Sequence, residues 1–155
     1  MILAIGSDHA AFGLKDHLVR FLSEANIQVR DVGPPDAEER VDYPDYAKMV
    51  CELVLKKEAR FGILLCGTGI GMSIAANKFP GIRAALAYFP EAAELSRRHN
   101  QANVLVLGGR IMGPELAEWT VSAFLNAEFE GGRHTARVEK IAQLERERLR
   151  GFLDA

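Results

Sequence analysis

A cysteine followed by three alternating glycines is the stretch of this 155-residue chain best suited to chemistry. An apolar run, residues 61–65, leads into Cys66, and glycines then alternate through residues 67–71. A helix that begins here would leave its first backbone N–H groups unpaired beside the positive end of its dipole, an arrangement that suits an anion. The same field favours the thiolate of a cysteine at the strand's end. One loop therefore has the parts to hold a negatively charged substrate and to supply a base for it.

The glycine spacing argues against a nucleotide site. No Gly-Lys-Ser or Gly-Lys-Thr follows, so this is not a Walker loop, and the third glycine comes one residue early for a dinucleotide loop. The next expected strand ends in Ala84-Ala85-Leu86, without an acid for a ribose. A purely structural turn and a small-anion site both fit, and Thr68 among the glycines favours the anion. Cys66 could equally be a small hydrophobic residue that fills space in the core. We prefer this interpretation for Cys51, which lies within an expected helix.

Histidines supply further candidate groups. His9 follows Asp8 directly after the first expected strand, where binding and catalytic residues concentrate. His99 and Asn100 lie at the end of an expected helix, and we expect His17 to be structural or exposed. The four histidines are too scattered in the sequence to predict a metal site.

Arginines near the end of the chain suit a phosphate. Arg133 and Arg137 are four residues apart at a helix start, so both point to one side. Paired arginines bind phosphate through charged, bidentate hydrogen bonds, although a solvated basic face fits the same pattern. Arg110, after Gly108-Gly109, would extend this cluster, but the spacing does not show that the three converge.

The elements that must position these residues alternate along the chain. Apolar runs predict strands over residues 2–5, 27–32, 61–66, 82–86 and 103–107. Periodic segments predict helices over residues 12–25, from 44, from 71 to 79, over 90–98 and 114–127, and from 133. This order predicts an α/β fold: a doubly wound, five-stranded, mostly parallel sheet with helices on both faces. The loops that carry Asp8, Cys66 and Arg110 would then meet at the carboxyl edge of the sheet. The last helix, about 133–150, lies outside the alternation, and we expect it to pack on a partner subunit.

Composition limits the classes of protein. A hydrophobic content of 48%, a charged content of 26% and a net charge of −2 are ordinary for one globular domain, here residues 1–155, and give no reason to expect nucleic acid or a membrane as partner. Two cysteines are too few for a disulfide framework, and the N-terminus lacks the basic start of a signal peptide. We therefore expect a cytoplasmic protein.

Seven short motifs make the pattern specific. In chain order they are Gly6-Ser7-Asp8-His9, Asp42-Tyr43-Pro44, Cys66-Gly67-Thr68-Gly69-Ile70-Gly71, Ala75-Ala76-Asn77-Lys78, Arg98-His99-Asn100, Asn103-Val104-Leu105 and Gly131-Gly132-Arg133-His134. Together they closely resemble the type B ribose-5-phosphate isomerases, whose wider family includes galactose-6-phosphate isomerase subunits. The resemblance extends to about Glu145. It implies a Rossmann-like homodimer that interconverts ribose 5-phosphate and ribulose 5-phosphate through an enediolate, without a metal or other cofactor.

The resemblance also implies residue roles. Cys66 would be the base that moves a proton between C1 and C2, while Thr68 and His99 would assist ring opening. The backbone of Gly67, Thr68, Gly69, Ile70 and Gly71 would stabilise the enediolate. The remaining substrate contacts would come from Asp8, His9, Tyr43, Asn100, Arg110, Arg133 and Arg137, the arginines gripping phosphate and some of them reaching across from the second subunit.

Two positions refine the comparison. Met72 stands where a second version of the family has a glutamate base, so the resemblance implies the cysteine version. Ala11 stands where the family usually has glycine, and its methyl group could crowd the loop or exclude a positive φ. Residues 146–155 find no match. Six-carbon substrates such as allose or galactose 6-phosphate, a tetramer, and a non-catalytic flavodoxin-like binding domain are the alternatives.

Overall fold

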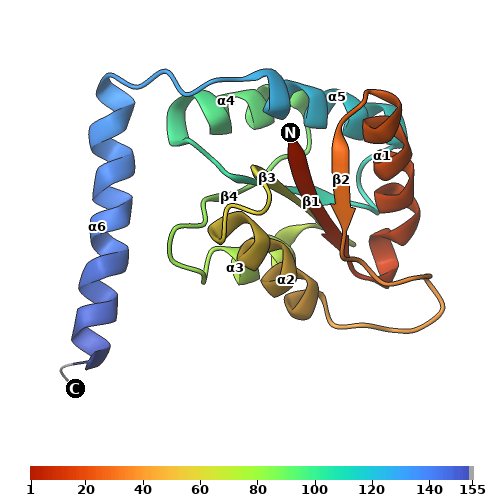
Figure 1. Ribbon diagram of the computed structural model, residues 1–155, viewed down its shortest axis with the longest axis horizontal. Coiled ribbons are helices and arrows are strands. Elements are labelled where there is room, and N and C mark those ends of the chain that lie inside the picture. The colour runs from red at the N-terminus through yellow and green to blue at the C-terminus, as the bar shows by residue number, and fades with distance from the viewer. Residues whose placement is uncertain (154–155) are drawn as a thin grey trace.

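The computed structural model describes residues 1–153 and is built on a five-stranded sheet. The strands are β1 (Ile2–Ser7), β2 (Gln28–Asp31), β3 (Phe61–Cys66), β4 (Ala84–Leu86) and β5 (Val104–Gly108). They lie in the order β2-β1-β3-β5-β4, and every pairing is parallel (Figure 1). The predicted α/β class is confirmed, with a sheet that is wholly rather than mostly parallel among the described residues.

Helices cover both faces of this sheet. The 3-10 turn η1 (His9–Ala11) precedes α1 (Phe12–Glu24), and the other covering helices are α2 (Tyr43–Leu55), α3 (Ile70–Ala76), α4 (Pro90–Asn100) and α5 (Pro114–Asn126). A further helix, α6 (Arg133–Leu153), does not pack on either face. Helices α1, α4 and α5 pack on one face, where Leu18 and Phe124 are fully buried, and α2 and α3 pack on the other, around Val50 and Met72 (Figure 1). Burial on both faces explains why the strands read as continuous apolar runs.

Strand register brings the expected loops to one edge. All six residues of β3 are buried, and Cys66 lies opposite Gly108 of β5. On the other side of β3, Leu65 lies opposite Ser7 at the end of β1. The turns after β1, β3 and β5 therefore leave the sheet side by side, as the carboxyl-end rule predicts.

At two element boundaries that differ from the expected ones, side chains take the place of backbone pairing. Helix α3 ends at Ala76, where the side chain of Asn77 donates to the carbonyl oxygen of Ala84 and accepts from its N–H, both at 2.9 Å. Strand β4 begins two residues late because the Arg83 N–H donates to the Asn103 side chain at 2.8 Å.

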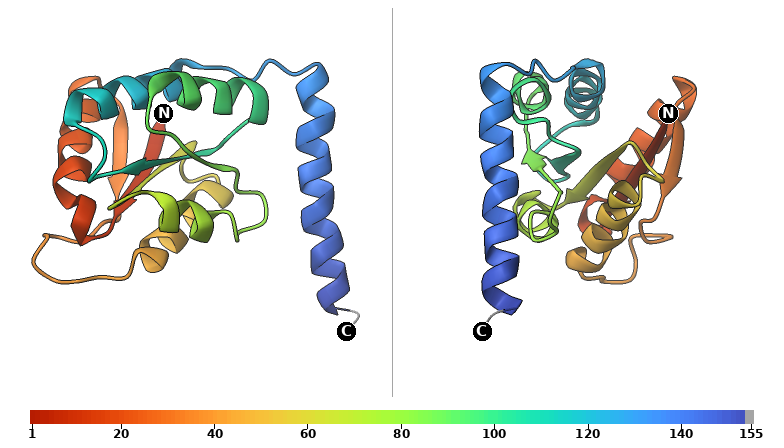
Figure 2. Two further views of the ribbon diagram at one scale, coloured as in Figure 1. Left: turned by 180° about the vertical axis from the view of Figure 1, so that it is seen from behind. Right: turned by 60° about the vertical axis from the view of Figure 1, so that its left-hand side comes forward.

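Helix α6 stands apart from the sheet (Figure 2). Its start lies near α4, and further along the Glu145 carboxylate accepts a hydrogen bond of 3.0 Å from the Gly81 N–H. A cavity of about 430 Å³ separates α6 from the β4 edge of the sheet, with Ile82 on one wall and Leu144 on the other.

Within residues 1–153, no helix is both long and apolar enough to cross a membrane. Residues 154 and 155, the end of the unmatched tail, lie outside the described residues.

Candidate active site

The loop after β3 surrounds the Cys66 sulfur with backbone. The Gly69 N–H donates to Sγ at 3.2 Å, and Cys66 is 4% exposed. Gly69 has φ 82°, and a Cβ there would lie 2.5 Å from Leu86 Cδ1 and 3.0 Å from the Leu107 carbonyl oxygen. Only glycine therefore fits this turn, which points an N–H at the sulfur. The other N–H in the loop with a side-chain partner is that of Ile70, which donates to the Thr68 hydroxyl at 3.2 Å.

Two predicted binding residues lie directly against this loop. The Arg110 N–H donates to the Gly67 carbonyl at 2.9 Å, and a Cβ at Gly67 would come within 3.4 Å of the Arg110 side chain. A Cβ at Gly71 would lie 2.6 Å from Cζ of Tyr43, so the tyrosine ring rests on that glycine. The glycines thus give the cation and the aromatic ring close access to the backbone beside Cys66.

Asp8 and His9 occupy the neighbouring turn after β1. Asp8 is 7% exposed, and its carboxylate accepts a hydrogen bond from the Ala11 N–H at 3.2 Å, which caps η1. The Asp8 N–H donates to the Leu65 carbonyl at 3.2 Å, which ties this turn to the end of β3. His9 Nδ1 accepts from the Val41 N–H at 3.3 Å, leaving Nε2 to carry the proton of the neutral ring.

Ala11 fits without strain where the family usually has glycine. Its φ is −116° and its side chain is buried, so the position requires no left-handed backbone. The methyl group packs against Gly109. A Cβ at residue 109 would lie only 2.6 Å from the Ala11 Cβ, so a larger residue would clash there. The Ala11 methyl group does not crowd the loop, because Gly109 has no side chain in the space that this methyl group occupies.

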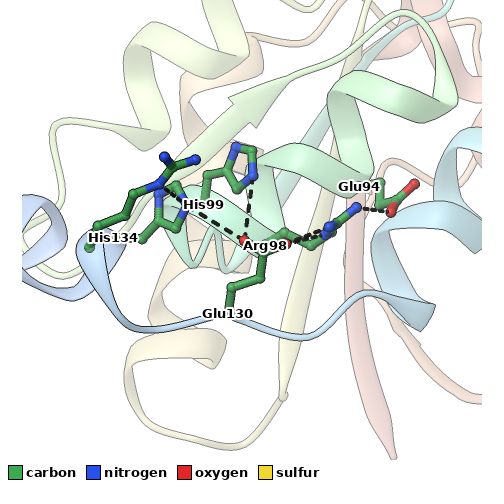
Figure 3. Close-up of polar contacts among 6 residues, drawn as sticks. Glu94, Arg98, His99, Glu130 and His134 are labelled. Atoms are coloured by element: carbon green, nitrogen blue, oxygen red, sulfur yellow. Dashed lines mark hydrogen bonds and ion pairs between the residues drawn. The ribbon is translucent and has the colours of Figure 1, made fainter.

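A second cluster of predicted residues gathers around His99. The rings of His99 and His134 stack in parallel, with centroids 4.3 Å apart and an interplanar angle of 6°. Glu130 Oε2 lies 3.7 Å from His99 Nε2 and 3.5 Å from His134 Nε2, while its Oε1 pairs with Arg98 at 2.5 Å (Figure 3). Arg133 Nε donates to His134 Nε2 at 3.4 Å. Residue spacing does not predict this stack, because its histidines lie on the different helices α4 and α6.

Charges within this cluster set its protonation. Hydrogen bonds from Arg98 lower the pKa of the Glu130 carboxyl, which keeps it ionised. Burial lowers the pKa of His134, and the neighbouring His99 and Arg133 lower it further. Near neutral pH the buried ring is therefore neutral and the carboxylate beside it is charged.

The same residues have the composition of a metal site but not its geometry. The ligand atoms of His99, Glu130 and His134 lie within 4.8 Å of one another. Metal ions bind imidazole nitrogens in the plane of the ring, and two parallel rings cannot both direct such a nitrogen at one ion. A cation would require the stack to open.

The two clusters lie at opposite ends of the parallel strands, the Cys66 cluster at the carboxyl ends and the His99 cluster at the amino ends. Cys66 lies opposite Gly108 at the carboxyl end of β5, whereas the Asn100 carbonyl accepts a hydrogen bond of 3.2 Å from Arg83, the residue before β4. The five residues of β5 separate these ends by about 13 Å of strand. One chain therefore unites Asp8, His9, Tyr43, Cys66–Gly71 and Arg110, and separately unites His99, Asn100 and the start of α6 with Arg133 and Arg137.

The remaining cysteine and histidine have structural positions. Cys51 is fully buried in α2, and burial raises the pKa of its thiol to about 12, so it is a poor nucleophile. His17 pairs with Glu118 at 2.6 Å between α1 and α5.

Comparison with known proteins decides the family. The sequence model of the Ribose/Galactose Isomerase family matches residues 3–141. The chain belongs to this family. It is 50% identical to ribose-5-phosphate isomerase B of Escherichia coli strain K12, over 94% of this chain and 97% of the relative. The family that the seven motifs predicted is thereby confirmed.

Solved structures of relatives have the same fold. A ribose 5-phosphate isomerase from Thermotoga maritima is 56% identical, with a TM-score of 0.90 over 92% of this chain and 97% of that one. Ribose-5-phosphate isomerase B from Clostridium thermocellum is 48% identical, with a TM-score of 0.93 over 95% and 99%.

Proposed function

We propose that this protein interconverts ribose 5-phosphate and ribulose 5-phosphate in the cytoplasm, at sites shared between the two subunits of a homodimer. The observation that carries the proposal is the division of the predicted site between the two edges of one sheet. A two-fold dimer can bring the Cys66 edge of one chain to the His99 edge of the other, and symmetry then creates two such sites. Family membership and the relatives' names support the substrate class.

Exposed apolar side chains support this association. On α3, directly after the glycine loop, Ile70 is 50% and Ile74 57% exposed. On α6, Leu144 is exposed beside the cavity that separates this helix from the sheet, and the exposed Leu149 lines a second cavity near Pro80. A second subunit that covers these faces would bury apolar surface, gaining about 25 cal/mol per Å². Native mass spectrometry distinguishes the dimer from a tetramer.

The first step opens the sugar ring. The C1–O4 bond of the furanose breaks, O4 keeps the electron pair and takes a proton from the partner's His99, and the C1 hydroxyl releases its proton to water as the aldehyde forms. Thr68, in the glycine loop, assists at the same end of the sugar. Arg110 and the partner's Arg133 and Arg137 hold the phosphate through charged hydrogen bonds.

The second step moves a proton between carbons. The Cys66 thiolate removes the proton on C2, the electron pair forms a C1–C2 double bond, and O1 becomes an oxyanion that the N–H groups of Gly67–Gly71 stabilise. Cys66 returns the proton to C1, and the proton on O2 moves to O1, which gives ribulose 5-phosphate. A thiolate and backbone amides supply this chemistry without a metal or cofactor.

The two cysteines provide the test. Cys66→Ala should lower kcat for ribose 5-phosphate by at least about 10²-fold, the lower range for a proton-transfer group, without loss of the fold. Cys51→Ala, which removes the other thiol, should keep kcat near that of the unaltered protein. Equal activity of both variants would overturn the assignment of the base.

The phosphate contacts have a separate readout. Arg137→Ala should raise KM more than it lowers kcat, because the phosphate is bound alike in the ground and transition states. Arg146→Ala, exposed on the same helix, is the matched control. An unchanged KM in Arg137→Ala would contradict the phosphate role. Comparing kcat/KM for ribose, allose and galactose phosphates identifies the preferred chain length.

A further inference from the structure

We propose that Glu130 is a positioning residue for His99, holding the imidazole in the orientation and charge state from which it gives a proton to the sugar ring oxygen. This inference rests on the proposed function. It assigns to Glu130 a part in ring opening only, and none in the proton transfer at Cys66.

Glu130 is itself held in place. Arg98 lies between two carboxylates, at 2.5 Å from Glu130 Oε1 and 2.8 Å from Glu94 Oε1. Because Arg98 occupies Oε1, the second oxygen of Glu130 is directed at the two imidazoles (Figure 3). A clamped carboxylate loses little freedom when it pairs with a histidine, so its charge acts on a defined ring position.

The Glu130 carboxylate acts differently on the His99 and His134 rings because the two rings differ in burial. The side chain of His134 is 7% exposed and that of His99 is 33% exposed. Two stacked imidazoles resist carrying two positive charges, and burial disfavours the charge on His134. Glu130 therefore acts on His99, the ring that reaches solvent and thus a substrate. His134 serves as a flat, neutral support that keeps the His99 ring from tilting.

Local backbone geometry places Glu130 for this task. Gly131 and Gly132 have φ values of 67° and 54°, a left-handed pair that turns the chain sharply between Glu130 and α6. The turn brings Glu130 and His134 to the same side, and the Glu130 N–H donates to the Arg98 carbonyl at 3.0 Å, which fixes the segment to the end of α4. Backbone and side chain of Glu130 are thus both anchored beside His99.

Ring opening can be measured without isomerisation. A Cys66→Ala protein lacks the base for C2 but should still open and close the ring, and so should speed exchange between the α and β anomers of ribose 5-phosphate. Exchange NMR on the 1-¹³C-labelled sugar measures this rate. Adding Glu130→Gln should slow the catalysed exchange by about tenfold or more, a part of the roughly 10²–10⁴-fold effect of a positioned proton donor. Adding Glu128→Gln, an exposed glutamate two residues away, should leave it unchanged.

A double-mutant cycle separates positioning from a structural effect. If Glu130 acts through His99, Glu130→Gln should cause no further loss in a Cys66→Ala protein that already carries His99→Asn. The affinity for ribose 5-phosphate should be the same in all these variants. An unchanged exchange rate in Glu130→Gln, or a full additional loss on top of His99→Asn, would overturn the proposal. If Cys66→Ala alone fails to speed the exchange, ring opening by His99 is wrong as well, so the two failures are distinguishable.

Discussion

Mixing two inactive variants tests whether the active site spans two chains. Cys66→Ala disables the carboxyl-edge cluster, and His99→Asn disables the cluster at the opposite edge. In a heterodimer of the two variants, one site combines both defects, and the other combines an intact Cys66 with an intact His99. Each heterodimer therefore regains one of its two sites.

The expected size of the recovery follows from this geometry. Random exchange of subunits makes half of the dimers mixed, and half of the sites in a mixed dimer are intact, so the mixture should reach about a quarter of the unaltered activity. Within one chain, the roughly 13 Å length of β5 separates the two clusters, so a site confined to one chain predicts no recovery.

The assay needs exchanged subunits and a matched pair. The two variants are unfolded together in urea, refolded and assayed with ribose 5-phosphate, while native mass spectrometry of a tagged variant counts the mixed dimers. Cys66→Ala mixed with Arg110→Ala is the control, because both changes lie at the same edge and no mixed dimer regains a complete site. Mixed dimers of Cys66→Ala and His99→Asn without activity would refute the shared site.

Three further predictions concern the loop and the core. Gly69→Ala forces a methyl group to 2.5 Å from Leu86 and 3.0 Å from the Leu107 carbonyl at a φ of 82°, so it should lower kcat by more than tenfold, about 1.4 kcal/mol, in a steady-state assay; an unchanged kcat would contradict the tight turn. Ala11→Gly should lower the free energy of unfolding in urea by about 1 kcal/mol without changing KM, because the alanine is buried at an ordinary φ; a gain in stability would show strain instead. The raised pKa of Cys51, about 12, means that only the unfolded chain loses this proton above pH 9, so stability should fall by up to about 1.4 kcal/mol per pH unit between pH 9 and 12, a slope that Cys51→Ala should reduce.

The fold and the part of the candidate site around Cys66 could be predicted from the sequence because the signals are local. Uninterrupted apolar runs predict strands covered on both faces, and the carboxyl-end rule places Asp8, Cys66 and Arg110 together. The boundaries at Asn77 and Arg83 could not be predicted, because they depend on side-chain hydrogen bonds between segments distant in sequence.

The other half of the site depends on tertiary packing. His99 and His134 are far apart in the chain, and their stack exists because α6 starts beside the end of α4. Glu130 is not among the residues predicted from the sequence, although its four-residue spacing to His134 and the two glycines between them are a usable signal. The Cys66–His99 relationship leaves no trace in spacing, because we place those residues on different chains.

Asn77 has a consequence for solubility. Strand β4 lies at the edge of the sheet, and an open edge is a template on which other chains add strands and aggregate. The Asn77 amide occupies both the N–H and the carbonyl of Ala84, as an added strand would. One side chain thus blocks a pairing position on this short edge strand, which opposes the addition of a strand from another molecule.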